Sequence, residues 1–152
     1  MAITQQEARE RILDELGAAV DAIAFAVACL GEAYEQLSVM GADRLEAELY
    51  RPVQRAYGRG KRTHAQFAER CGLPGREFGS QSAGRRSQGI KVFVEQAVVA
   101  AARADQAIAD LQDSMLPIES GDAELRVGLT EVRDLLGELP SAAREFLRTL
   151  GR

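Results

Sequence analysis

The sequence predicts an all-α fold: an up-and-down four-helix bundle with a kinked or broken last helix and a long glycine-rich loop. Apolar residues recur at alternating steps of three and four along most of the 152 residues, which places them on one face of each helix. The one cluster of β-branched residues, 90–99, lies inside such a repeat, so strand signals are missing. Short connections between long helices favour antiparallel neighbours.

The first predicted helix covers about residues 4–40. Thr4 and Glu7 have the spacing of a capping box, in which a hydroxyl and a carboxylate satisfy free backbone amides at a helix start. A continuous apolar seam follows, and alanine occupies several of its positions. We expect Gly41 to end this helix, because glycine adopts left-handed backbone angles at low cost.

The second helix is predicted over about 43–71, with a break near 58–62. Asp43 repeats the capping spacing, since a glutamate follows three residues later. Gly58 and Gly60 each cost about 1 kcal/mol relative to alanine inside a helix. We therefore expect the helix to stop at these glycines and to restart just after them.

Two more helices are predicted over about 88–116 and 120–150. Both carry the same alternation of three and four, and Pro117 separates them. Pro140 lies inside the last seam, where it removes a backbone hydrogen bond and produces the expected kink or break. The loop of about 72–89 contains five glycines and one proline. A loop of that length is functional or disordered in most compact domains. We expect a mobile basic excursion over about 58–89 that includes this loop.

Length and composition predict a single helical domain over 1–152. The N-terminus has no basic segment followed by an apolar one, so a secretory signal is not expected. The most apolar stretch, 16–30, is interrupted by Asp21 and is shorter than the roughly 20 residues that a membrane span needs. We expect a cytoplasmic protein that is not embedded in a membrane.

Catalytic and metal-binding signals are weak. Cys29 and Cys71 lie far apart in the sequence, and His64 is the only histidine. A zinc site needs about four ligands in tetrahedral reach, and di-iron bundles need Glu-x-x-His pairs, whereas Lys61 stands three residues before this histidine. We expect no metal, no cofactor and no enzymatic activity, with the histidine satisfied in the core.

Charge divides the chain into three blocks. Residues 1–50 carry three basic and ten acidic side chains, residues 51–91 carry ten basic and two acidic, and residues 92–152 carry six basic and eleven acidic. The net charge of −4 therefore hides a strongly basic middle third between acidic ends. Arg51 begins a row of arginines about one helical turn apart, which would line one face of an unbroken helix.

Two functions fit this pattern. The first hypothesis is a non-enzymatic interaction or scaffold protein, a homo-oligomer whose basic segment meets an acidic protein surface. The alternative is a protein that binds nucleic acid or another polyanion through the basic segment 51–91; the negative net charge argues against it. Both hypotheses use the same candidate anion- or partner-binding residues: Arg55, Arg59, Lys61, Arg62, Arg76, Arg85 and Arg86.

One segment offers a route to DNA. Residues 63–81 resemble a helix-turn-helix in spacing, with Phe67 and Ala68 in the first helix, Gly72 in the turn and Leu73 after it. The resemblance implies a second helix that would enter the DNA major groove. The prolines and glycines that follow are poor helix formers, which argues against that helix.

Overall fold

The computed structural model describes residues 4–150, and every regular element in that range is helical. The all-α prediction is therefore confirmed for this part of the chain. The elements in order are α1 (Gln5–Glu35), α2 (Val39–Leu45), the π-helical turn η1 (Glu46–Tyr50), α3 (Arg51–Cys71), the 3-10 turn η2 (Arg86–Gln88), α4 (Ile90–Asp113), α5 (Leu116–Glu119), α6 (Ala123–Gly137) and α7 (Leu139–Leu150).

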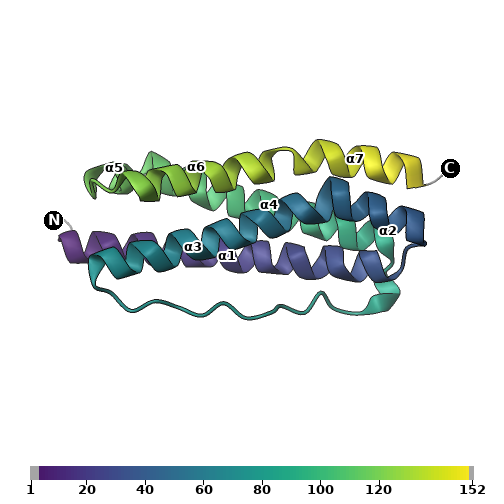
Figure 1. The fold of residues 1–152 in the computed structure, drawn as a ribbon, viewed down its shortest axis with the longest axis horizontal. Helices are drawn as coiled ribbons and strands as arrows, with labels where there is room; N and C mark the ends of the chain where they lie inside the picture. Colours follow the sequence, from purple (N-terminus) through teal and green to yellow (C-terminus); the bar gives the residue numbers. More distant parts are fainter. Residues whose placement is uncertain (1–3, 151–152) are drawn as a thin grey trace.

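The long helices lie side by side along the molecule (Figure 1). Helix α1 packs against α3 and α4, and α6 packs against the same two helices from the other side. The bundle therefore has a lateral face between each pair of neighbours: α1/α3, α3/α6, α6/α4 and α4/α1. These faces carry different side chains, and the candidate sites below are described by face.

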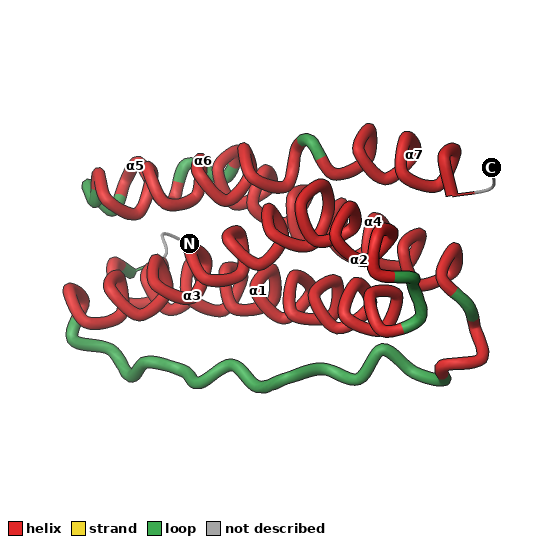
Figure 2. The backbone as a smooth tube through the Cα atoms, turned by 45° about the vertical axis from the view of Figure 1, so that its right-hand side comes forward, coloured by secondary structure: helices red, strands yellow, loops and turns green. Residues whose placement is uncertain are grey.

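Helices α3 and α4 run in the same direction. Residues 72–89, called the crossing segment below, return along the length of the bundle before α4 begins (Figures 1 and 2). The up-and-down order expected from the sequence is therefore not the order in the structure. An extended chain spans about 3.3 Å per residue and a helix rises only about 1.5 Å, so residues 72–85 alone are long enough to pass the 21-residue α3.

The crossing segment is held against α1 and α3. The Tyr57 hydroxyl donates a hydrogen bond to the Phe78 carbonyl at 3.5 Å, and the Gln36 side chain donates to the Arg86 carbonyl at 2.9 Å. Ala83 of the segment itself is buried. The expectation of a mobile basic excursion over 58–89 is therefore wrong for its first part, which is helix α3, and its remainder covers the α1/α3 face.

The boundary between the first two helices lies earlier than predicted. Helix α1 has the capping box expected at Thr4, but it ends at Glu35 rather than near residue 40. Ser38 caps α2 by accepting a hydrogen bond from the backbone amide of Gly41 at 3.3 Å. Gly41, which was expected to end the first helix, therefore lies inside the first turn of α2. The Ser38 side chain caps this second helix three residues before the glycine.

The break predicted near 58–62 is wrong, because α3 is continuous. Gly60 lies on its buried face, where an added Cβ would stand 2.9 Å from Val20 Cγ2 of α1. The glycine therefore permits a close approach of two helices. Burial of the rest of α3 compensates for its low helix propensity, which is a weak preference that tertiary packing often overrides.

Pro52 is accommodated by the π-helical turn η1. Proline has no backbone N–H and its ring clashes with the carbonyl four residues earlier. In η1 the Arg51 amide donates to the Glu46 carbonyl, five residues back, which widens the helix ahead of the proline. The path from α2 through η1 to α3 is consequently helical throughout.

The C-terminal half is more finely divided than predicted. Helix α4 occupies 90–113 of the expected 88–116, and the short α5 follows it. The expected last helix of 120–150 begins at Ala123, where Asp122 caps α6. It is interrupted at Glu138, two residues before Pro140, and α7 continues from there.

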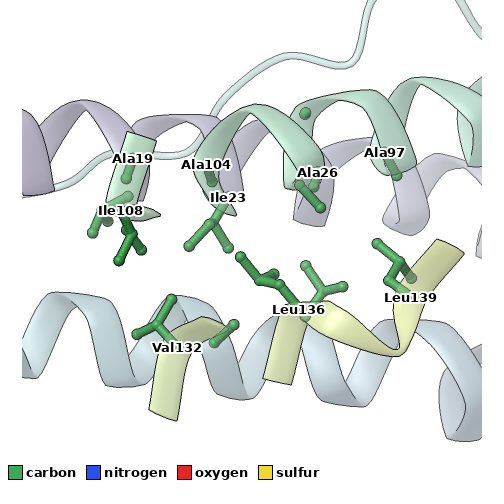
Figure 3. Packing of buried hydrophobic residues seen from close by; sticks show 14 of the residues in the cluster. Ala19, Ile23, Ala26, Ala97, Ala104, Ile108, Val132, Leu136 and Leu139 are labelled. Atoms are coloured by element: carbon green, nitrogen blue, oxygen red, sulfur yellow. The ribbon is translucent and has the colours of Figure 1, made fainter. Parts of the chain in front are cut away.

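Alanine seams bring α1 and α4 into the most extensive helix–helix contact of the described chain. Ala19 and Ala26 of α1 lie beside Ala97 and Ala104 of α4, all of them buried, and larger side chains of the other helices close the core (Figure 3). Small side chains let helix axes approach closely, which gives many van der Waals contacts in a dense interior.

Helix α1 also has the length and composition of a membrane-spanning helix. An 18-residue window has a mean hydropathy of 1.7, so the sequence estimate that placed its apolar stretch below the required length was too strict. In the structure 56% of that window is buried against other helices. The apolar character of α1 is thus explained by its place in the core.

A close contact between α3 and α6 generates a stability prediction. An added Cβ at Gly128 of α6 would stand 2.7 Å from Thr63 Cγ2, whereas nothing lies within 4 Å of one at Gly137. We expect Gly128→Ala to lower the free energy of unfolding by about 1–3 kcal/mol, the usual cost of overpacking. Gly137→Ala should leave it unchanged or raise it by up to about 1 kcal/mol. Urea denaturation measures both, and equal losses would contradict the contact.

Candidate anion-binding groove and buried histidine pocket

A groove of about 400 Å³ runs along the α3/α6 face. Its arginines recur one turn apart on the side of α3 opposite the buried face, so a helix without a break presents them together. Gly58 lies among them and leaves room for their side chains. We call this the arginine groove, and its lining residues are Arg51, Gln54, Arg55, Gly58, Arg59 and Arg62 of α3 with Glu131 and Leu135 of α6.

One arginine of the groove is committed within the chain. The Arg59 guanidinium donates to the Glu131 carboxylate through Nε and to Thr63 Oγ1 at 3.1 Å. The Thr63 hydroxyl in turn donates to the Arg59 carbonyl at 2.8 Å. This small network ties α3 to α6 at the close contact with Gly128, so the same packing that joins the helices also shapes the groove.

The other arginines of the groove are uncommitted. Within residues 4–150, Arg51, Arg55 and Arg62 have no carboxylate within 4.0 Å. Arg55 and Arg62 are exposed to solvent. The groove therefore presents guanidinium groups without counter-charges, which is the arrangement that binds carboxylates or phosphates.

Elsewhere the basic middle third is neutralised inside the chain. Four of its cations form ion pairs with the acidic blocks on either side, in addition to the Arg59–Glu131 pair. Half of the ten basic side chains are thus paired, which explains much of the charge division seen in the sequence. The four pairs are Arg70 with Asp122 and Glu124, Arg76 with Asp21, Arg86 with Glu32, and Lys91 with Glu95.

Asp122 is the most constrained carboxylate among these pairs. Burial alone would raise its pKa, but hydrogen bonds from Arg70 and from the Leu125 amide outweigh burial and hold the pKa below its usual value. The side chain accepts from Arg70 at 2.7 and 2.8 Å and caps α6 at 2.9 Å. Arg70 therefore joins the end of α3 to the start of α6.

The structure divides the candidate residues predicted from the sequence. Arg55, Arg59 and Arg62 meet in the arginine groove together with Arg51. The other four do not line it. Lys61 lies 4.2 Å from the centre of the Tyr57 ring, Arg76 borders a second pocket, Arg85 is exposed on the crossing segment, and Arg86 pairs with Glu32.

Sequence reasoning missed the α6 side of the groove. Glu131 and Leu135 reach it only because α6 packs beside α3. No spacing within the sequence indicates that pairing. The helix-turn-helix hypothesis is also wrong, because residues 73–85 form no helix after α3. Gly72 ends α3 in the left-handed conformation, at a φ of 66°.

A second pocket, of about 540 Å³, lies between α1, α3 and the start of the crossing segment. His64 forms part of its wall with only 3% of the residue exposed. Its ring meets the Phe78 ring edge to face at 5.2 Å, and Nδ1 has no hydrogen-bond partner among the described residues. The histidine is thus in the core as expected, but one of its two ring nitrogens, Nδ1, is not satisfied there.

Arg76 closes this pocket. Its guanidinium donates to both Asp21 carboxylate oxygens at 2.8 Å and to the Gly17 carbonyl at 3.3 Å. It also lies 4.4 Å from the centre of the Phe78 ring. These contacts fix the start of the crossing segment on α1, beside His64.

Metal-ligating side chains do not gather around these sites in the described residues. No group of three or more histidine, cysteine or acidic side chains in residues 4–150 is placed to hold a metal ion. Burial raises the pKa of the Cys29 thiol to about 11, so the thiolate nucleophile is not formed near neutral pH. Burial also raises the pKa of Cys71.

His64 makes stability depend on pH. Burial lowers its pKa below the ordinary 6.5 and positive Arg76 acts in the same direction, while the Leu13 carbonyl and Asp14 oppose them. Well above pH 6.5 the imidazole is neutral in both states. As the pH falls below that value the unfolded chain takes up the proton more readily, so the free energy of unfolding falls until the native imidazole titrates.

We therefore expect the wild-type protein to lose stability between about pH 7.5 and about pH 5.5. The variant His64→Gln should lose less over the same interval, because its glutamine does not titrate. Urea denaturation at the two pH values measures the difference. Identical losses in the two proteins would show that His64 has the same pKa in the folded and unfolded chains.

Comparison with known proteins identifies no similar family, curated protein or solved structure. No relative therefore indicates what either site binds. The function is inferred from the charges and packing of the chain itself.

Proposed function

We propose that this chain is a non-enzymatic interaction protein, a four-helix bundle with one long crossover connection that binds an acidic protein surface in the arginine groove. The single observation that carries the proposal is the row of uncommitted guanidinium groups of Arg51, Arg55 and Arg62. Cations elsewhere in the basic segment largely have carboxylate partners in the chain. The three uncommitted guanidinium groups in the groove can therefore pair with carboxylates of another protein.

The spacing of the groove suits a helical partner. Arg51 and Arg62 stand eleven residues apart on α3, which is about 16 Å along the helix axis. Carboxylates one turn apart on an acidic helix have the same repeat, so several pairs can form at once. Leu135 supplies an apolar surface beside them, against which the stems of the side chains can pack.

Charge favours a protein partner over a nucleic acid. Glu131 lies at the edge of the groove with 51% of its side chain exposed, and it repels a phosphate as well as a carboxylate, so a chain of phosphates meets this repulsion repeatedly. The net charge of −4 adds a general repulsion of a long polyanion. An acidic patch on a protein is smaller than a nucleic-acid strand and can meet the arginines without facing the rest of the surface.

The test uses a 15-residue alanine-rich helical peptide with glutamates one turn apart. We expect Arg55→Gln/Arg62→Gln to weaken its binding about tenfold, since two exposed ion pairs each contribute up to about 1 kcal/mol. The matched control is Arg126→Gln/Arg144→Gln, which changes the net charge equally. Arg126 stands two turns before Arg133, which bonds to α4, so it faces away from the groove. Isothermal titration calorimetry measures the affinities, and equal weakening by both variants would overturn the proposal.

Glu131→Gln gives a prediction of opposite sign. The substitution removes a carboxylate from the groove and releases Arg59 from its ion pair. We expect the same peptide to bind several-fold more tightly, measured in the same titration. Unchanged or weaker binding would show that the peptide binds outside the arginine groove.

A 15-nucleotide single-stranded DNA serves as the competing probe, and tighter binding of the DNA than of the peptide at about 0.15 M salt would favour the polyanion function instead.

A further inference from the structure

The α4/α1 face carries an apolar stripe that the core does not use. A shallow groove of about 350 Å³ lies there, with Phe25 of α1 on one side and Val92 and Val99 of α4 on the other. Val99 is 57% exposed and Val92 38% exposed. The buried face of α4 is already filled by its alanines and by larger apolar residues, so these valines lie outside the core.

The outward residues of α4 have the spacing of a helix–helix seam. Val92, Glu95, Val99, Ala102 and Gln106 follow one another at steps of three and four. Val92, Val99 and Ala102 are the apolar members of this row, and apolar residues at such steps form a stripe that can pack against another helix. Within residues 4–150 no element of the same chain covers the two valines, which remain exposed.

Charge around Val99 is self-complementary. Glu95 stands four residues before it and Arg103 four residues after it, and both line the groove. If a second copy approaches antiparallel about a two-fold axis at Val99, each Glu95 lies opposite Arg103 of the other copy. The two valines then meet at the centre. A closed two-fold contact requires this kind of self-complementary patch.

We propose that the α4/α1 face docks a second copy of this chain through an antiparallel α4–α4 contact centred on Val99. The contact is independent of the arginine groove, because the α4/α1 and α3/α6 faces have no helix in common. Lys91 already lies 3.8 Å from Glu95, but both side chains are more than half exposed. Such a pair contributes little, so Glu95 is free to meet a better partner.

The size of the stripe sets the expected strength of the dimer. From Val92 to Gln106 the stripe is about 21 Å long, and an interface of that length falls in the small class that buries less than about 1,200 Å². We therefore expect a reversible dimer that is populated at roughly 100 µM and dissociates on dilution.

Sedimentation velocity from roughly 5 to 500 µM tests the dimer in that range. The wild-type chain should shift from monomer to dimer as the concentration rises, and Val99→Glu should stay monomeric because it places two carboxylates at the centre of the contact. Val127→Glu is the matched control, since Val127 is 52% exposed on α6. It should dimerise like the wild type. A wild-type monomer over the whole range, or equal loss in both variants, would overturn the proposal.

Charge reversal tests the antiparallel register. Glu95→Arg alone and Arg103→Glu alone each place like charges opposite one another, so each should weaken the dimer at least fivefold. The double variant Glu95→Arg/Arg103→Glu exchanges the two charges and should restore the wild-type dissociation constant. Failure of the double variant to restore it would contradict the proposed register. The Val99→Glu variant should still bind the acidic peptide. Loss of dimerisation and loss of peptide binding in the arginine groove are therefore distinguished by separate measurements.

Discussion

Close approach of helices at small residues is the constraint on which this structure depends. Alanines let α1 and α4 pack along most of their length, Gly60 lets α3 approach Val20, and Gly128 lets α6 approach Thr63. The last of these contacts also determines the candidate site. Because α6 lies this close to α3, Glu131 reaches Arg59 and the remaining arginines are left in a groove beside the pair. Packing in the core and charge on the surface are therefore set by the same few positions.

The crossing segment makes the lateral faces unequal. It covers the α1/α3 face, where Arg76 and Phe78 hold it beside His64. The α3/α6 face presents arginines, and on the α6/α4 face Arg133 bonds to Asp105 and Gln112. The α4/α1 face presents exposed valines, with Glu95 and Arg103 on either side of Val99. The molecule thus carries surfaces of distinct chemistry on its different faces.

The sequence predicts the helical class and the alanine seams because both follow from local periodicity. It does not predict the continuity of α3, since Gly60 is explained by Val20 of another helix. The parallel α3 and α4 escape prediction because the rule that neighbours are antiparallel holds only for short connections. For the site, helical spacing singles out Arg55, Arg59 and Arg62 as candidates, but their meeting on one face depends on the same continuity of α3. The sequence does not predict the contribution of Glu131 to the groove. Nor does it predict that half of the basic segment pairs with acidic helices, because both features depend on which helices become neighbours.

Contact between a partner's carboxylates and the arginine groove is measured most directly by NMR of the arginine side chains. In the ¹⁵N-labelled protein, each Nε–H group reports its own hydrogen bonding. Titration with the glutamate peptide should shift the Nε–H signals of Arg55 and Arg62 and leave those of Arg126 and Arg144 in place. Signals that move equally at all four arginines, or only at Arg85 and Arg86 of the crossing segment, would contradict binding in the groove.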